Sequence, residues 1–390
     1  MKRSQLAILV LLVLVLGGAA LVLVMRSTTS WQSSAGHLPA KVVNLSINDV
    51  VRITFTQPAG QVNLVKKGDK WVVAERANYP ANFEMISAFI RKVWELKPVQ
   101  EQQVGPSQLG RLDLLEPGQG SNSGTLVDFK AADGKRLAAV LLGKKYLRES
   151  DQSFAQGRSF PAGRYVMPED GSHQVSLVTD PFAQADDKAE RWLDHGFIKI
   201  EKPISIACAG QSPAVSWTLE RGPESTEWKW VDARPGEQLD EIKAKQIASA
   251  VGSLSSFVDV LAPDAKPETT GLDNPVTFTI MTEDGFTYVL GVGKKIGEQY
   301  PVTIAVSANI PAARTPAKDE KAEEKTKLDK DFQTKREALE KKLRTEKGFE
   351  GRPFLISKFS IEQLEKSRTD LLAPKATPTA TPSPTPERRK

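Results

Sequence analysis

The sequence TLVDFKAADGKRLAAVLLG at residues 125–143 returns in altered form as VTFTIMTEDGFTYVLGVG at residues 276–293. Both stretches alternate apolar and polar residues around an Asp-Gly pair, as half-buried strands do. Asp133-Gly134 and Asp284-Gly285 predict tight turns, because glycine tolerates the positive φ that such turns need. Each stretch therefore predicts a β-hairpin, and each hairpin ends in Gly-Lys-Lys, at 143–145 and at 293–295.

Further segments correspond in the same order along the chain. They are 52–55 with 205–208, 62–64 with 217–219, 68–71 with 225–228, 112–113 with 272–273, and 163–167 with 351–355. A helix is expected after the third pair in each half, with Asn82 as the N-cap of the first. The expected apolar faces are Ile86, Phe89, Ile90 and Val93, and Ile247, Ala250, Val251 and Leu254. The series predicts an internal duplication.

The predicted fold class is α+β, with two tandem copies of an antiparallel-sheet-plus-helix unit after one N-terminal transmembrane helix. We place the cytoplasmic tip and anchor at residues 1–30 and a linker at 31–41. The two repeats are placed at 42–196 and 197–372, and a disordered Pro- and Thr-rich tail at 373–390.

One uninterrupted apolar segment, Leu6–Met25, lies near the start of the sequence. A helix of ~20 residues reaches ~30 Å, so this segment is long enough to span the hydrocarbon core of a bilayer. Lys2 and Arg3 precede it, which favours a cytoplasmic N-terminus and an extracytoplasmic remainder. The alternative is a cleaved signal peptide, with Gly18 and Ala20 as the small residues of its cleavage site. We expect an anchor, because the apolar run continues past these residues.

Composition excludes several classes of protein. The chain has 53 basic and 48 acidic residues, a near-balance that argues against a nucleic-acid-binding surface. Its single cysteine, Cys208, excludes an internal disulfide framework and a cysteine-rich metal site. We expect Cys208 to be a buried structural thiol, because it lies in an apolar alternating stretch.

A densely charged segment at 318–347 interrupts the second half. Its large apolar residues, at spacings of one narrow helical stripe, are Leu328, Phe332, Leu339 and Leu343. Such a stripe is typical of a coiled-coil seam and predicts a helix that docks on a partner. A solvated single helix or a disordered loop is the alternative interpretation, slightly favoured by the charge density.

No pattern of catalytic residues is found in the sequence. The three histidines, His37, His173 and His195, have no second histidine or cysteine at metal-ligand spacing. The glycine-rich stretch 118–124 lacks the serine of a nucleophile elbow and the lysine of a phosphate loop. The sequence therefore predicts a non-enzyme with no cofactor and no metal ion.

Three tryptophans are the remaining candidates for ligand contact. Trp71 and Trp228 begin corresponding strands, and Trp230 follows two residues later. Their rings are able to stack on a ligand, but a place in the core or at the rim of each sheet is the favoured interpretation.

The chain resembles the bacterial family catalogued as DUF 4340, a domain of unknown function. The resemblance rests on the Trp71 strand, the helix at 81–96, the Asp133-Gly134 hairpin, the Tyr165-Val166 strand and the stretch 189–206. It covers roughly residues 42–372, whereas the insertion 318–347 and the tail depart from the family pattern. The resemblance implies an association with ABC-type transport systems of the gliding-motility kind, with their ATPase, permease and related extracytoplasmic subunit. It implies no catalytic residues.

Together these features predict a non-enzymatic, membrane-anchored accessory subunit of an ABC-type transport or cell-envelope complex. We expect a single pass, at residues 6–25, through the bacterial cytoplasmic membrane, with protein–protein binding outside it. The alternative function is an extracytoplasmic binding module for an envelope glycan or peptide. The expected contact residues are Trp71, Trp228, Trp230, Leu328, Phe332, Leu339 and Leu343.

Overall fold

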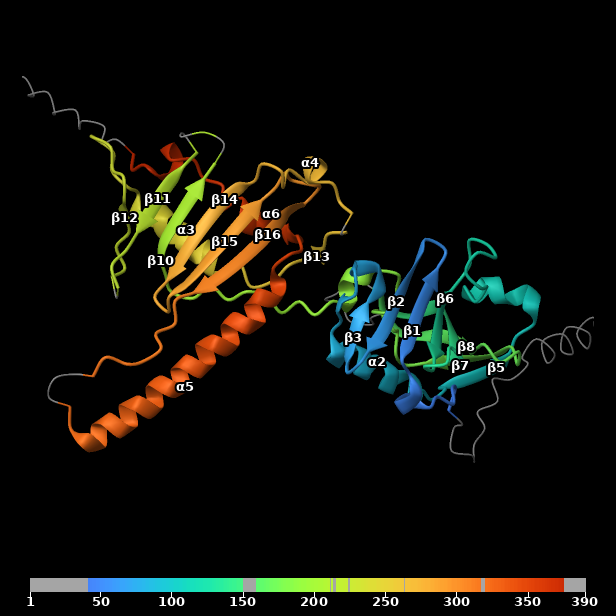
Figure 1. Ribbon diagram of the computed structural model, residues 1–390. Coiled ribbons are helices and arrows are strands. Elements are labelled where there is room, and N and C mark those ends of the chain that lie inside the picture. Colours follow the sequence, from blue (N-terminus) through green and yellow to red (C-terminus); the bar gives the residue numbers. More distant parts are fainter. Residues whose placement is uncertain are drawn as a thin grey trace, which may run out of the picture. The chain divides into compact units, whose positions relative to one another are not determined.

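Two antiparallel sheets organise the chain (Figure 1). The computed structural model describes residues 41–149 and 159–374, except 211, 213–214, 224, 263 and 317–319. The chain divides between Asp194 and His195 into two units with one sheet each. A mixture of helices and antiparallel sheets was expected from the sequence, and at this level the α+β class is confirmed.

The first unit contains a nine-stranded sheet in the order β4-β3-β2-β1-β6-β7-β8-β9-β5. Its strands are β1 (Arg52–Gln57), β2 (Gly60–Lys67), β3 (Lys70–Val73), β4 (Tyr79–Pro80), β5 (Gln100–Gln103), β6 (Thr125–Lys130), β7 (Arg136–Glu149), β8 (Ser159–Pro168) and β9 (Gln174–Val178). Strands β6 and β7 form the predicted hairpin, and Gly134 in its turn has a φ of 83°.

Helix α2 (Phe83–Trp94) packs its apolar face on this sheet. The side chain of Asn82 accepts the N–H of Met85 at 3.0 Å, so the predicted N-cap is confirmed. Phe89 is fully buried, and its ring centroid lies 5.1 Å from that of Phe55 on β1 and 5.7 Å from that of Trp192. Burial of these aromatic rings fixes the helix on the sheet.

The second unit contains an eight-stranded sheet in the order β12-β11-β10-β14-β15-β16-β17-β13. Its strands are β10 (Pro203–Ala209), β11 (Trp217–Glu220), β12 (Lys229–Trp230), β13 (Asp259–Val260), β14 (Val276–Thr282), β15 (Phe286–Val292), β16 (Gln299–Ala308) and β17 (Phe354–Ser357). Strands β14 and β15 form the second predicted hairpin. A side chain at Gly285 would place its Cβ 2.6 Å from the carbonyl oxygen of Asn309, so only glycine fits this turn.

Helix α3 (Glu241–Gly252) corresponds to α2 in chain order, because each helix is directly followed by the strand at the far edge of its sheet, β13 or β5. Asp240 caps it, accepting the N–H of Ile242 at 3.0 Å. Its buried residues are Ala244, Ile247 and Val251. Leu254 is also buried, although it lies beyond the end of the helix.

The remaining helices are short, except one. They are α4 (Pro267–Thr270), α5 (Ala322–Glu346) and α6 (Lys358–Ile361), with 3-10 turns at Ile47–Asp49, Ala74–Arg76, Pro106–Leu112, Ala189–Trp192, Lys347–Phe349 and Thr369–Leu371. Helix α5 lies within the charged segment 318–347, between strands β16 and β17.

The two strand orders correspond strand by strand, except that β4 has no counterpart. This correspondence places β8 opposite β16 and β9 opposite β17. The match of 163–167 on β8 with 351–355 on β17 is therefore wrong by one strand. Local similarity around Gly163 and Gly351 was misleading, because the α5 segment separates β17 from the strand before it. The duplication itself stays a prediction.

The sequence from Trp192 to Gly196 is typical of a helix end with a glycine C-cap, but the structure differs. The 3-10 turn ends at Trp192, and Leu193 follows it in an extended conformation. Leu193 forms a β-bridge with Ala81, and the N–H of Asp194 donates to the carbonyl oxygen of Pro80 at 2.9 Å. This pairing with the start of α2 holds the chain extended where a helix cap would curl it.

The predicted anchor at Leu6–Met25, the linker up to residue 40 and the tail from residue 375 lie outside the described residues. Among the helices that the structure does describe, none is both long and apolar enough to cross a membrane.

The equivalent caps allow a paired test of the two units. Replacing Asn82 with alanine removes one acceptor at the start of α2 and should cost about 1 kcal/mol of local stability. Hydrogen exchange measured by mass spectrometry should speed up in α2 and stay unchanged in α3. Asp240→Ala should produce the reverse pattern, and acceleration of both helices in either variant would contradict two independently capped units.

Candidate partner-binding surfaces

Helix α5 is held to the second unit at its C-terminal end. Glu346 is buried, and its carboxylate accepts the N–H of Lys199 at 2.9 Å and the O–H of Tyr288 at 2.8 Å. Burial and the nearby Glu346 carboxylate raise the pKa of Tyr288, which keeps the phenol protonated as a donor. Lys342 adds a cation–π contact, with its Nζ 4.7 Å from the ring centroid of Phe286.

The middle of α5 lies against the second hairpin. Lys335 forms an ion pair with Asp284 at 3.4 Å, and Arg336 donates to the carbonyl oxygen of Ala312 at 2.9 Å. Phe332 and Leu339 line a groove of about 260 Å³ beside the turn at Gly285. The structure thus brings two of the four predicted stripe residues together at one groove.

The N-terminal part of α5 extends away from the sheet of its unit (Figure 1). Arg314, in the segment leading to the helix, pairs with Asp329 at 2.7 Å and with Glu320 at 2.7 Å. Leu328 on this part is 44% exposed. Phe332, Leu339 and Leu343 are half-buried, so the predicted stripe is only partly accessible on this charged helix. Where the structure describes the segment 318–347, it is a helix, α5, and not a disordered loop.

A second surface surrounds Trp71, which we call the Trp71 groove. It has a volume of about 420 Å³ and lies between strand β3, helix α2 and the 3-10 turn that precedes β1. Its lining residues are Ile47, Asn48, Val50, Lys66, Trp71, Phe83, Ser87, Ile90, Arg91, Trp94 and Glu95. Trp71 itself is only 5% exposed and forms the floor, whereas Phe83 is 62% exposed at the rim.

A third surface, the Trp228 groove, lies at the corresponding place in the second unit. It is lined by Pro203, Arg221, Thr226, Trp228, Lys245 and Ala248. Trp228 is also only 5% exposed, and Arg221 lies over its ring with its guanidinium carbon 5.8 Å from the ring centroid. Arg221 is fully engaged, because it pairs with Glu283 at 3.0 Å and donates to two carbonyl oxygens at 2.6 Å.

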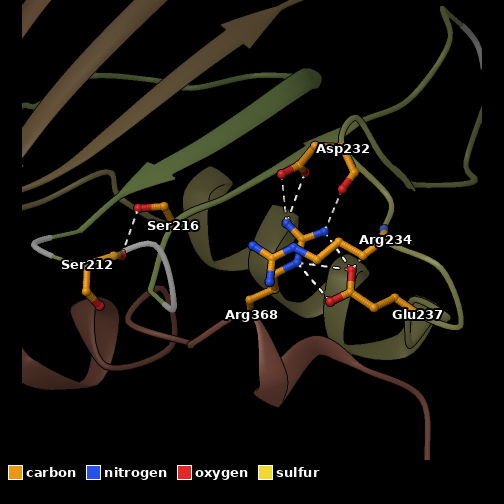
Figure 2. Close-up of polar contacts among 6 residues, drawn as sticks. All are labelled: Ser212, Ser216, Asp232, Arg234, Glu237 and Arg368. Atoms are coloured by element: carbon orange, nitrogen blue, oxygen red, sulfur yellow. Dashed lines mark hydrogen bonds and ion pairs between the residues drawn. The ribbon is translucent and has the colours of Figure 1, made fainter.

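The ring of Trp230 is covered by another side chain and does not offer an open face to a ligand. The guanidinium of Arg368 covers it, with its carbon 4.5 Å from the ring centroid. Figure 2 shows how Arg368 joins the C-terminal segment to the residues after β12: it bonds Asp232 at 2.9 Å and Glu237 at 2.7 Å. Hydrogen bonds from Arg368 hold the pKa of Glu237 below its ordinary value, which keeps this pair ionised at neutral pH. The same figure shows Ser216 donating to the carbonyl oxygen of Ser212 on the neighbouring loop.

Two buried groups add no reactive chemistry. Cys208 is 3% exposed, as expected, and burial raises its pKa to about 12, so the thiol stays protonated and unreactive at neutral pH. Arg164 is buried on β8, and burial lowers its pKa to about 10. Its guanidinium donates to the carbonyl oxygens of Leu142 and Gly143, among others, and so ties β7 to β8.

The histidines are separated in the structure. His195 places Nδ1 3.0 Å from the carbonyl oxygen of Phe257, His173 lies in a turn with φ 51°, and His37 lies outside the described residues. Across the described residues, no group of three or more His, Cys, Asp or Glu is placed to hold a metal ion.

The family profile described as "Domain of unknown function (DUF4340)" matches residues 71–275, just over half of the chain. The chain belongs to the DUF4340 family. The match begins at Trp71 and ends before strand β14, so α5 lies outside it, whereas Trp228 and Trp230 lie inside. No curated protein and no solved structure matches this DUF4340 protein.

Several residues at these surfaces were not singled out from the sequence. Phe83, Trp94, Lys66 and Arg91 complete the Trp71 groove, and Glu346 anchors α5. A signal for Phe83 was present, because it is a large aromatic residue directly after the N-cap and off the apolar face of its helix. Glu346 carried no signal, since it is one of many charged residues in α5.

The anchor of α5 can be tested by removing its carboxylate. Glu346→Ala should destabilise the second unit by about 1–3 kcal/mol, because the N–H of Lys199 loses its charged acceptor and the Tyr288 phenol keeps only the Lys199 carbonyl oxygen at 3.1 Å. Urea unfolding followed by tryptophan fluorescence measures the loss. Glu346→Gln should lose less, and Glu340→Ala, which removes a surface glutamate on the same helix, should change little. Equal effects of Glu346→Ala and Glu340→Ala would rule out the anchoring role.

Proposed function

We propose that this DUF4340 protein is a non-enzymatic, membrane-anchored accessory subunit of an ABC-type transport or cell-envelope complex. It acts by binding protein partners outside the bacterial cytoplasmic membrane. The single observation that carries the proposal is helix α5, which is fixed at its C-terminal end and carries an apolar stripe that is exposed at Leu328 and half-buried at Phe332, Leu339 and Leu343.

The physical chemistry of α5 suits docking on another helix. Charged residues of both signs keep the helix soluble, whereas Leu328 and Phe332 form a narrow apolar seam like that of a coiled coil. An exposed leucine costs free energy in water, and a partner helix that covers it recovers roughly 25 cal/mol per Å² of apolar area removed from water. Attachment through Glu346 fixes the direction in which the helix leaves its unit.

The rest of the chain serves as the platform in this proposal. The two sheets with common strand order are taken as a tandem duplication, and Leu6–Met25 as the single-pass anchor that places the platform beside the permease. The class of complex comes from the resemblance to the family. The family match itself names no activity, so the function is argued from the surfaces.

The alternative function is a binding module that uses the tryptophans, and its two candidate ligands, a glycan and a peptide, make different demands on the site. Sugar stacking needs an open ring face, and the small exposure of Trp71 and Trp228 together with the Arg368 cover on Trp230 weighs against it. Peptide binding at the Trp71 groove does not need an open tryptophan face, because the exposed Phe83 supplies one.

Site-specific photocrosslinking in cells tests the α5 interface. A photoreactive phenylalanine analogue in place of Phe332 should yield a crosslinked product of higher mass. The same analogue at Thr334, which is exposed on the opposite side of α5, is the matched control and should yield little. Leu328→Glu should weaken the product at position 332, because it places a charge in the seam. Equal crosslinking at 332 and 334, or none at 332, would contradict docking through the stripe.

A further inference from the structure

The Trp71 groove combines an apolar surface with cations that lack partners within the described chain. Lys66 and Arg91 both line the groove, are exposed, and form no ion pair among the residues that the structure describes. A third cation, Lys41, lies over the Trp94 ring with its Nζ 3.4 Å from the ring centroid. Among the lining residues themselves, two are cationic, Lys66 and Arg91, and one is acidic, Glu95.

The apolar part of the groove is large and accessible. Phe83 is 62% exposed and Ile47 is 36% exposed, and they lie with Ile90 and Trp94 around a floor formed by Trp71. Aromatic anchors in a concave pocket are the features that dominate the energy of protein interfaces. A volume of about 420 Å³ has room for large apolar side chains.

The Trp228 groove shows which of these features the shared fold requires. The two helices bury residues at the same spacing, Ile86, Phe89 and Val93 in α2 and Ala244, Ile247 and Val251 in α3. Aligned in this way, Phe83, Ile90, Arg91 and Trp94 correspond to Glu241, Ala248, Ser249 and Gly252. The fold therefore needs neither the aromatic rim nor the cation of α2 at these positions.

The cation contributed by strand β2, Lys66, also differs from its counterpart in the second unit. The strand registers pair Ile53 with Leu64 and Ile206 with Leu219, so Lys66 corresponds to Arg221. Arg221 is neutralised by Glu283 at 3.0 Å, whereas Lys66 has no such carboxylate among the described residues. The apolar rim and the unpaired charge thus occur together in the first unit only.

We propose that the Trp71 groove binds a segment of a partner protein that carries large apolar side chains flanked by acidic residues. The apolar side chains fill the space between Phe83, Trp94 and the Trp71 floor, and the acidic residues pair with Lys66 and Arg91. The concavity favours a peptide segment over a flat lipid surface. This inference rests on the proposed function but concerns a different surface from α5. Its test uses the purified chain and synthetic peptides, so peptide binding at the Trp71 groove and docking through α5 can fail independently.

A random library of short peptides displayed on phage, panned against the immobilised full-length chain, tests the proposal. Enriched peptides should be acidic and should contain large apolar residues. A synthetic peptide of the enriched sequence should bind Phe83→Ser about tenfold or more weakly than the unaltered chain. Ile242→Ser, which removes an apolar residue 69% exposed at the start of α3, is the matched control and should leave binding unchanged.

Charge reversal separates the electrostatic part from the apolar part. Lys66→Glu combined with Arg91→Glu should weaken binding of the acidic peptide and should make the affinity less sensitive to salt. Absence of enrichment, enrichment without acidic residues, or binding that survives Phe83→Ser would overturn the proposal. Phe83-dependent binding to anionic phosphatidylglycerol vesicles without peptide binding would assign the groove to the membrane surface and would also overturn it.

Discussion

The packing of one capped helix on one antiparallel sheet is the constraint on which each unit depends. In the first unit, Phe89 of α2 meets Phe55 of the central strand and Trp192 of the closing turn, and the three rings are fully buried. The second unit has a smaller residue, Ile247, at the position of Phe89. Because the buried face of each helix is committed to its own sheet, only the opposite face and the rim are available to evolve contacts with partners.

Those outward surfaces distinguish the two units. The first has an apolar groove between β3, α2 and the 3-10 turn before β1, with the cations Lys66 and Arg91, which are unpaired among the described residues. In the corresponding groove of the second unit the helix contributes smaller side chains, and Glu283 neutralises Arg221. The second instead carries α5, a long helix fixed by Glu346. Two similar frameworks therefore present different surfaces, and under the proposed function each surface would hold a different neighbour.

Much of the fold could be predicted from the sequence, because period-2 alternation and Asp-Gly turns are local signals. Asn82 was identified as a cap and both hairpin turns lie where they were expected, although β7 continues to Glu149, past the end predicted at residues 143–145. The predicted correspondence between residues 163–167 and 351–355 was wrong. A long insertion before β17 breaks the constant sequence separation by which the members of a repeat are matched. The Trp71 groove was only partly predictable: Trp71 was found, but Lys66 and Arg91 belong to different elements that meet only in the folded chain. The exposure of Trp71 and Trp228 likewise depends on neighbours that no spacing rule reveals.

The measurement that tests the central claim most directly is co-purification of the full-length protein from gently solubilised native membranes, with quantitative mass spectrometry of the bound proteins. The account predicts an ABC-type ATPase and its permease in near-stoichiometric amounts. Reproducible recovery of the protein by itself would contradict its role as an accessory subunit.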